Sequence, residues 1–317
     1  MKKLKKPNLF VVGAAKCGTT ALYKFLSLHP EVYMSPIKEP HFFSKDIRYS
    51  NFSSKYRRRN YFNSKRYFSK EKLDYMQIAF IEDEKDYLSL FKGSTNEKYL
   101  GEISNGYLIS KNAHQEIYNF NRDAKIIMIL RNPLERAFSH WRQENRSGFS
   151  KSNSFYNDII DDFSLNDEQW GGKSNTYVQL GLYSKQINKY LNLFPKSNIK
   201  VLFYDDLVSK PQELRKDLFK FLNIKEIDID FSKRHNPDFE GRNFLIKSLF
   251  KKYRSVDHKM KYWIPNFIKS ISKKLLFKQK SDKIAISDYE KTKLKKIFLN
   301  DIISVEEILN VNLERWK

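Results

Sequence analysis

A strand, a glycine-bounded loop and a helix follow one another near the start of the chain, and this order constrains the fold more than any other feature. Leu9 to Val12 is apolar, Gly13 to Thr20 reads GAAKCGTT, and apolar residues then recur at helical spacing at Ala21, Leu22, Phe25, Leu26 and His29. The N–H groups of such a loop and of the helix after it converge on one point. The segment therefore predicts an anion site between a strand and a helix.

A second strand and helix follow in the same order further along. Ile126 to Leu130 is fully apolar, and Arg131 and then Asn132-Pro133-Leu134-Glu135 come after it. Asn132 is a favourable helix cap, proline suits the first helical position, and Glu135 is expected to complete a capping box. The sequence predicts a second helix that begins here.

The remaining segments continue this alternation. A strand is expected over Ile199 to Phe203 and a helix over Pro211 to Leu222. Another helix is marked by Leu180, Tyr183, Ile187, Leu191 and Phe194. From about Asp288 to Trp316 a closing helix is expected from Leu294, Ile297, Ile302, Val305 and Leu309. Buried strands that alternate with helices predict an α/β fold, a central parallel sheet with helices on both faces.

The chain of 317 residues is expected to form a single domain over 1–317. A hydrophobic fraction of 40% is enough to fill a substantial core. Three regions interrupt the pattern and are expected to be insertions, at about 44–80, 145–176 and 244–283. The first is basic and aromatic, the second contains an acidic stretch and the third is cationic with interspersed apolar residues.

The net charge and the cysteine content indicate which kinds of partner and which cellular compartment to expect. Lys+Arg number 59 against 37 Asp+Glu, a formal net charge of +22, which favours anionic partners. The single cysteine, Cys17, excludes an intramolecular disulfide and predicts a reducing, cytoplasmic location. The apolar run after the lysine-rich start, Leu9 to Val12, is too short for a signal peptide, and no run approaches a membrane span.

The loop differs from the phosphate loop of nucleotide kinases. In a Walker loop the lysine follows the second glycine, but that position is Thr19 here and the lysine is Lys16, inside the loop. Walker-type enzymes hold magnesium with an aspartate after an apolar strand, whereas Arg131 follows Ile126 to Leu130 and would attract a second phosphate instead. Asp205-Asp206, after the strand that ends at Phe203, keeps a nucleotide kinase or NTPase open as an alternative.

These residues resemble the P-loop sulfotransferases, which use 3'-phosphoadenosine 5'-phosphosulfate (PAPS), and within them the branch of heparan sulfate sulfotransferases. Phe10 to Phe43, FVVGAAKCGTTALYKFLSLHPEVYMSPIKEPHFF, is similar to the family's PAPS-binding opening. Leu130 to Ser139, LRNPLERAFS, is similar to its 3'-phosphate element. Further similar segments are Glu102 to Tyr107, Gly181 to Leu222 and Leu313 to Trp316. The resemblance spans most of the chain and implies a three-layer P-loop-type fold.

The resemblance also implies roles in cofactor binding. The loop residues Ala15, Lys16, Cys17, Gly18, Thr19 and Thr20 are expected to hold the 5'-phosphosulfate, and Lys16 to stabilise charge on the departing phosphate. Arg131 and Ser139 are expected to hold the 3'-phosphate, although an arginine at a strand end also suits a structural ion pair. A sulfuryl group carries less charge than a phosphoryl group, so a lysine is expected to take the place of a metal.

Two further cofactor contacts are expected. Tyr204 follows an apolar strand and would approach the nucleotide, with core packing as an equal alternative. Arg242 belongs to Glu240-Gly241-Arg242, which keeps the glycine and arginine of the family's Lys-Gly-Arg element but not its lysine.

The catalytic base is expected to be Glu39, because an acceptor hydroxyl must lose its proton as it attacks. Lys38 to Phe43, KEPHFF, resembles the family's Glu-x-His-Phe-Phe element. His41 is then expected to orient or supplement Glu39, with packing in the core as the alternative. Some relatives have an aspartate after the two phenylalanines, but Ser44 stands there in this chain.

The sequence thus predicts a metal-independent sulfotransferase that converts PAPS to 3'-phosphoadenosine 5'-phosphate (PAP) and sulfates a carbohydrate or another hydroxyl-bearing acceptor. No specific nucleic acid partner is expected. The basic segments Tyr49 to Phe68 and Leu245 to Phe277 could bind a polyanionic glycan or a membrane surface. A non-enzymatic basic module that binds polyanions is the second alternative.

Overall fold

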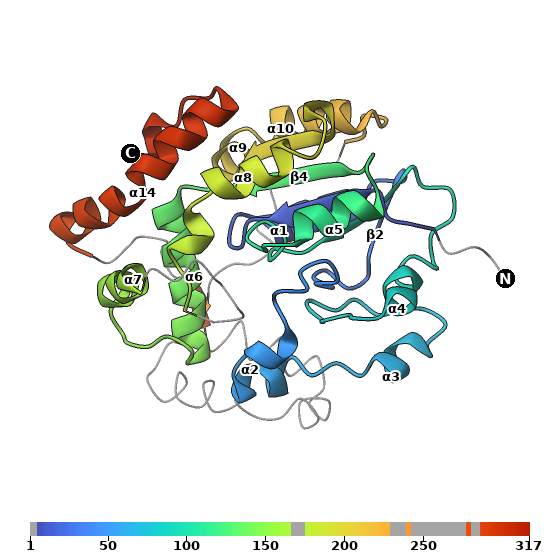
Figure 1. Cartoon of the computed structure of the whole chain (residues 1–317), viewed down its shortest axis with the longest axis horizontal. Coiled ribbons are helices and arrows are strands. Elements are labelled where there is room, and N and C mark those ends of the chain that lie inside the picture. Colours follow the sequence, from blue (N-terminus) through green and yellow to red (C-terminus); the bar gives the residue numbers. More distant parts are fainter. Residues whose placement is uncertain (1–4, 166–174, 229–238, 242–276, 280–285) are drawn as a thin grey trace.

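A computed structural model of the chain describes residues 5–165, 175–228, 239–241, 277–279 and 286–317 (Figure 1). Five parallel strands form its central sheet in the order β2-β3-β1-β4-β5. These strands are β1 (Leu9–Gly13), β2 (Val32–Met34), β3 (Tyr99–Ile103), β4 (Lys125–Leu130) and β5 (Ile199–Phe203). The predicted α/β fold with a parallel sheet is confirmed.

The central strand β1 is buried at every position, between β3 and β4. Its register places Phe10 opposite Glu102 on one side and opposite Ile126 on the other. The chain leaves β1 toward β2 and later crosses from β3 to β4, so β1 lies where the direction of the connections reverses. In such sheets, ligands bind outside the carboxyl ends of the strands at this point.

Helices surround the sheet, and Figure 1 shows α14 beside α8 and α6, with α2, α3 and α4 in another part of the molecule. The helices are α1 (Thr19–Ser27), α2 (Ser54–Arg59), α3 (Ser64–Phe68), α4 (Glu84–Ser89), α5 (Ala113–Phe120), α6 (Pro133–Ser147), α7 (Phe155–Ser164), α8 (Ser184–Leu191), α9 (Tyr204–Ser209), α10 (Pro211–Leu222) and α14 (Asp288–Leu309). Short 3₁₀ turns are η1 (Tyr49–Asn51), η2 (Gln179–Gly181), η3 (Lys196–Asn198) and η4 (Glu314–Trp316).

Three of the five parallel strands, β1, β4 and β5, match the predicted ones. β2 and β3 were not expected from the sequence. β2 has only three residues, and β3 contains Gly101 and Glu102 within its apolar run. Both strands are set by pairing with neighbours distant in sequence, which periodicity does not reveal.

The start of α6 confirms one part of its prediction and corrects another. Asn132 caps the helix, its Oδ1 accepting from the N–H groups of Leu134 and Glu135, and Pro133 is the first helical residue. The expected capping box is wrong, because the Glu135 carboxylate accepts from the Arg131 guanidinium at 3.0 Å instead. A charge-assisted contact is stronger than one to a neutral N–H.

Two other predicted helices are shorter than expected. The helix expected from Leu180 to Phe194 is divided into η2 and α8, and Asp301 of α14 accepts from the N–H groups of Tyr183 and Ser184 where α8 begins. The closing helix ends at Leu309, where Asn310 adopts a left-handed conformation.

The predicted insertions are described to different extents. Residues 44–80 contain η1, α2 and α3, and residues 145–176 contain the end of α6 and all of α7. Of residues 244–283, only 277–279 are described, as β7 (Phe277–Gln279), which pairs antiparallel with β6 (Phe239–Gly241). The rest of that insertion lies outside the described residues.

Candidate functional site

The candidate site lies at the carboxyl edge of the sheet, because the segments that follow all five parallel strands carry its residues. The loop that begins at Gly13, the last residue of β1, runs to Thr20, Glu39 follows β2 and Asn105 follows β3. Arg131 follows β4, and Tyr204 follows β5.

The phosphate loop is tightly packed against its neighbours. Gly18 caps α1 with a left-handed φ of 95°, and a Cβ added there would lie 3.0 Å from side-chain atoms of both Tyr204 and Leu207. A Cβ on Gly13 would lie 2.8 Å from Cβ of Leu108. Both positions therefore require glycine.

The start of α1 offers N–H groups to an anion, since the first N–H groups of a helix have no carbonyl partner within it. Thr19 is buried, and Thr20 and Ala15 are half-buried. Cys17 was expected to contact the cofactor, but its thiol lies in the core, 3.7 Å from Oη of Tyr183. Its backbone N–H donates to the Ala14 carbonyl. Burial raises the pKa of this thiol, so it stays neutral.

Lys16 projects toward α6, where its Nζ donates to Oε1 of Gln143 at 2.8 Å. Lys16 itself has a left-handed φ of 69°. Gln143 was not among the predicted site residues, and a glutamine within a helix gives no signal in the sequence alone. The structure thus places a neutral amide beside the loop lysine.

Arg131 and Tyr204 come together beside the loop. The guanidinium lies over the Tyr204 ring, 4.4 Å from its centroid, and the same ring packs on Gly18. The Arg131 side chain is 16% exposed, and its carbonyl accepts from Oη of Tyr183 at 3.0 Å. Arg131 makes the structural ion pair that the sequence allowed, here with Glu135, and its contact with a 3'-phosphate stays a prediction. Ser139 is half-buried on α6.

Glu39 is buried, and the two oxygens of its carboxylate have different surroundings. Oε1 accepts from Lys38 at 2.7 Å, Asn105 at 3.0 Å and Gln77 at 3.2 Å. Among the described residues, the nearest polar contact of Oε2 is Nε2 of His41 at 3.6 Å, which is too long for a good hydrogen bond. Three donors fix one oxygen and leave the other to a further donor.

The charge state of Glu39 is set by its immediate neighbours. Burial alone would raise the pKa of this carboxyl, but Lys38 and then His41 outweigh burial and lower the pKa to about 2. The Lys38 side chain is itself only 1% exposed. Glu39 is therefore ionised at neutral pH and held in a buried ion pair.

His41 lies against Glu39 and also packs in the core. Its ring stacks on Phe80 at 4.7 Å, and its Nδ1 lies 3.4 Å from Oγ of Ser44. His41 therefore lies where it could orient Glu39 and is also packed in the core, the two alternatives that the sequence offered.

A second buried carboxyl lies on α6, one residue after Gln143. Glu144 has one oxygen 3.8 Å from Nε2 of His140 and another with no hydrogen-bond partner in the part of the chain that the structure describes. Burial raises the pKa of Glu144 to about 7, against the charges of Arg59, Lys16 and Lys55. Burial and then the charges of Glu39 and Glu144 raise the pKa of Tyr56 on α2.

The basic and aromatic insertion at residues 44–80 contacts both α6 and the Glu39 segment. Lys55 of α2 donates to the carbonyl of Gly148, at the end of α6, at 3.1 Å. Its Nζ also lies 4.7 Å from the ring centroid of Phe149. Phe52 stacks on Tyr56 at 4.3 Å and contacts Phe80 at 5.3 Å, which in turn stacks on His41. A continuous set of rings therefore joins α2 to the Glu39 segment.

Asp205 and Asp206, the residues on which the alternative of a nucleotide kinase or NTPase depends, both contact residues near the end of the sequence. Asp205 accepts from Nε1 of Trp316 at 2.8 Å and from Arg315 at 3.1 Å, and Asp206 lies 3.6 Å from Arg315. Among the described residues, no group of three or more His, Cys, Asp or Glu is arranged to hold a metal ion. Within the same residues, no helix is long and apolar enough to span a membrane.

One expected cofactor residue, Arg242, lies outside the described residues. Glu240 and Gly241 before it belong to β6.

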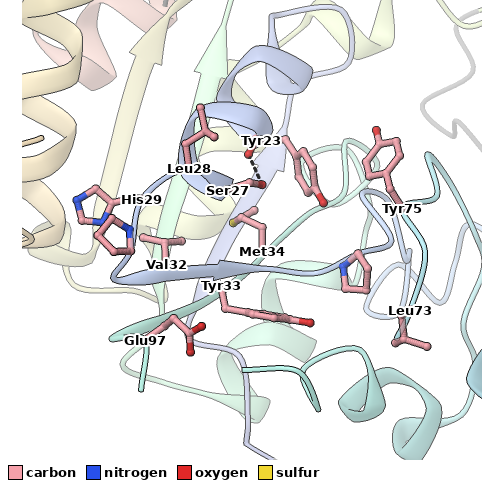
Figure 2. A pocket seen from close by; sticks show the side chains of 12 residues that line it. Tyr23, Ser27, Leu28, His29, Val32, Tyr33, Met34, Leu73, Tyr75 and Glu97 are labelled. Carbon is pink, nitrogen blue, oxygen red and sulfur yellow. Dashed lines mark hydrogen bonds between the residues drawn. The ribbon is translucent and has the colours of Figure 1, made fainter. Parts of the chain in front are cut away.

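A groove of about 460 Å³ opens between the end of α1 and β2 (Figure 2). Tyr23, Tyr33, Tyr75 and Glu97 are among its lining residues. Oη of Tyr75 donates to Gln77 at 2.9 Å, and Gln77 donates to Glu39. The groove therefore adjoins the Glu39 segment through Gln77.

Known proteins with similar sequences are carbohydrate and heparan sulfate sulfotransferases. Carbohydrate sulfotransferase 15 of Rattus norvegicus is 26% identical over 251 residues, covering 69% of this chain and 44% of the relative. Heparan sulfate glucosamine 3-O-sulfotransferase 5 of Homo sapiens is 26% identical over 218 residues, covering 69% of this chain and 54% of the relative. The chain thus spans about half the length of these relatives.

A solved sulfotransferase from Alicyclobacillus acidocaldarius has the same fold, with a TM-score of 0.65 and 24% identity over 98% of this chain and 99% of that one. The sulfotransferase domain family matches residues 6–236, which include the phosphate loop, Glu39, Arg131 and Tyr204. The fold is the P-loop type that the resemblance implied. This chain belongs to the sulfotransferase domain family.

Proposed function

We propose that this chain transfers a sulfuryl group from PAPS to a hydroxyl group of a carbohydrate acceptor. The observation that carries the proposal is the convergence of a phosphate loop, a cationic strand end and a buried glutamate at one edge of the sheet. Lys16, Arg131 and Glu39 supply these three features. Family membership supports the reaction class.

The donor side fits a nucleotide with phosphate at both ends. The first N–H groups of α1 and the Lys16 ammonium would hold the 5'-phosphosulfate, with Gln143 keeping the lysine directed across the loop. Arg131 would hold the 3'-phosphate by exchanging its partner Glu135, which is 49% exposed and can turn to solvent. Lys16 would also stabilise negative charge on the departing phosphate.

The acceptor side would use Oε2 of Glu39. As the acceptor oxygen bonds to sulfur and the bond from sulfur to the phosphate oxygen breaks, the acceptor proton passes to Oε2. The three donors on Oε1 keep the carboxylate oriented for this step. A pKa of about 2 makes Glu39 a weak base, so we propose that Lys38 turns toward the sulfuryl group during transfer and leaves Glu39 more basic.

Carbohydrate is the proposed acceptor class because relatives of this chain are named for carbohydrate and heparan sulfate. The net charge of +22 also favours an anionic glycan, including peripheral binding through the basic segment Tyr49 to Phe68. No comparison supports the cytoplasmic location expected from the sequence, and it stays a prediction.

The decisive experiment is transfer of label from ³⁵S-PAPS to a panel of glycans that includes heparan sulfate. Removing Glu39 alone would leave Lys38 buried without a charged partner, at a cost of about 3–5 kcal/mol, so loss of activity could reflect unfolding. Lys38→Met alone would likewise leave Glu39 buried without its cation, so its folding is checked by circular dichroism, and it should retain part of the transfer because Glu39 remains. Lys38→Met combined with Glu39→Gln removes both charges of the pair and should lose transfer at least a hundredfold relative to Lys38→Met.

Binding of the product provides an independent measurement. PAP without magnesium should stabilise the protein by about 2.7 kcal/mol at 100 times its Kd, and Lys16→Ala should abolish this effect. Lys24→Ala, which removes an exposed lysine from the helix α1 that follows the loop, is the matched control. Stabilisation by ATP with magnesium but not by PAP would contradict the proposal and favour a kinase.

A further inference from the structure

The segment that carries Glu39 is held from behind by a buried carboxylate that no step above uses. Glu102 lies in β3 with no exposed surface and accepts three hydroxyl hydrogen bonds. Oη of Tyr87 and Oη of Tyr107 each donate to Oε1 at 2.8 Å, and Oγ of Ser104 donates to Oε2 at 2.9 Å. No cation of the described residues pairs with Glu102, and a buried carboxylate held by neutral donors is unusual.

Two of these hydroxyls also accept from the backbone of the Glu39 segment. The N–H of His41 donates to Oγ of Ser104 at 3.2 Å, and the N–H of Phe43 donates to Oη of Tyr107 at 3.2 Å. Each hydroxyl thus joins one backbone N–H to one oxygen of Glu102. Tyr87 is the exception, because no backbone N–H of this segment is bonded to its hydroxyl, although its ring stacks on Phe42 at 4.2 Å.

The backbone at His41 needs such support. Its φ of 53° lies in the left-handed region, which a non-glycine residue adopts only when its surroundings hold it there. The segment is fixed on its other side by Met76 to Ile81, where Ala79 and Ile81 donate to the carbonyls of Glu39 and Pro40 at 3.0 Å. The hydroxyls of Ser104 and Tyr107 supply the contacts on the β3 side.

We infer that Glu102 is a positioning residue for the catalytic segment, holding the N–H groups of His41 and Phe43 through Ser104 and Tyr107 and so fixing where Glu39 and His41 lie. The catalytic role of that segment rests on the proposed function, but the geometry does not. Burial raises the pKa of Glu102 to about 7 despite the three hydroxyls that favour its charged form.

Two tyrosines on the same carboxylate oxygen give a matched test. Tyr107→Phe and Tyr87→Phe each remove one hydroxyl that lies 2.8 Å from Oε1 of Glu102, and each keeps the ring. Of the two hydroxyls, only that of Tyr107 accepts from a backbone N–H of the Glu39 segment. Amide hydrogen exchange of residues 38–44 should be about fivefold faster in Tyr107→Phe and in Ser104→Ala, and should match the wild type in Tyr87→Phe. Glu102→Gln should accelerate the same amides, since an amide nitrogen cannot accept.

Turnover and cofactor binding separate positioning from general stability. With ³⁵S-PAPS, Tyr107→Phe should lower kcat about tenfold or more while the PAP-induced stabilisation is unchanged, and Tyr87→Phe should change neither. Equal exchange in residues 38–44 for both tyrosine variants would overturn the inference. If amide exchange follows the expected pattern but PAP does not bind, the proposed function fails and the positioning role of Glu102 stands. If PAP binds but exchange is equal in the two tyrosine variants, the positioning role fails and the proposed function stands.

Discussion

The buried glutamates Glu39 and Glu144 have pKa values shifted in opposite directions. Lys38 lies 2.7 Å from Glu39 and lowers its pKa, whereas one oxygen of Glu144 has no partner within the described ranges and burial raises its pKa to about 7. A cation within hydrogen-bond distance outweighs burial, and more distant cations do not. Two carboxyls near one site therefore differ in charge between pH 4.5 and 7.

Glu144 predicts a loss of stability as the pH rises. The unfolded carboxyl ionises near 4.5 and the folded one near 7, so the free energy of unfolding should fall between these values and then level off. The shift corresponds to at most about 3 kcal/mol. Glu144→Gln should reduce this fall by up to that amount in urea unfolding at pH 5 and pH 8.

Glu102 and Asp162, whose pKa values burial raises, should add to the remaining slope, whereas His140, whose pKa burial lowers, should oppose it. Glu213→Gln, an exposed glutamate of α10, controls for the loss of one negative charge. An unchanged difference between pH 5 and pH 8 in Glu144→Gln would show that Glu144 is ionised in the folded protein throughout this range.

At the scale of elements, α8 begins where α14 caps it. Asp301 of α14 accepts from the N–H of Tyr183 at 2.6 Å, from the N–H of Ser184 at 3.1 Å and from the Ser184 hydroxyl. Tyr183 in turn contacts Cys17 and donates to the Arg131 carbonyl. The closing helix thus determines where α8 starts and supports the phosphate loop from behind.

Asp301→Ala should lower the free energy of unfolding by about 1–2 kcal/mol, the cost of losing a helix cap. Urea unfolding followed by circular dichroism measures this, with Glu307→Ala, an exposed glutamate on the same helix, as the control. Equal stability of the two variants would contradict a capping role for Asp301.

At the scale of the whole molecule, the last residues join the two strand ends that form the nucleotide side. Trp316 is buried against Phe203, donates to Asp205 of α9, and its carbonyl accepts from Asn132 at 3.2 Å. Tyr204 and Arg131 lie directly beside these contacts. The position of Tyr204 over the phosphate loop therefore depends on the chain's far end.

Trp316→Ala should lower the free energy of unfolding by about 3–5 kcal/mol, because it leaves a large cavity. Trp316→Phe should cost about 1 kcal/mol through the lost indole hydrogen bond, and should also reduce the stabilisation by PAP. Thermal unfolding with and without PAP measures both effects.

Trp141→Phe is the matched control, since its indole N–H also donates to an aspartate, Asp158, at 2.9 Å but between α6 and α7. An equal loss of PAP stabilisation in Trp141→Phe would show that the effect of Trp316 is not specific to the nucleotide side.

The sequence by itself determined the α/β class, the strands β1, β4 and β5, the phosphate loop and the cap at Asn132. These depend on residues close together in the chain, where an apolar run, a glycine and a capping side chain leave few conformations. The match of Phe10 to Phe43 and Leu130 to Ser139 to known sulfotransferases also came from the sequence, and family membership confirmed it.

Only the tertiary structure decided which groups meet at the site. Gln143 beside Lys16, Asn105 and Gln77 on Glu39, and the hydroxyls between Glu102 and the Glu39 segment join residues from different strands and helices. The burial of the Cys17 thiol and the engagement of Asp205 by Trp316 were likewise set by packing. The physical reason is that side chains far apart in the chain acquire their partners, and their pKa values, only when the parallel strands bring their carboxyl ends to one edge.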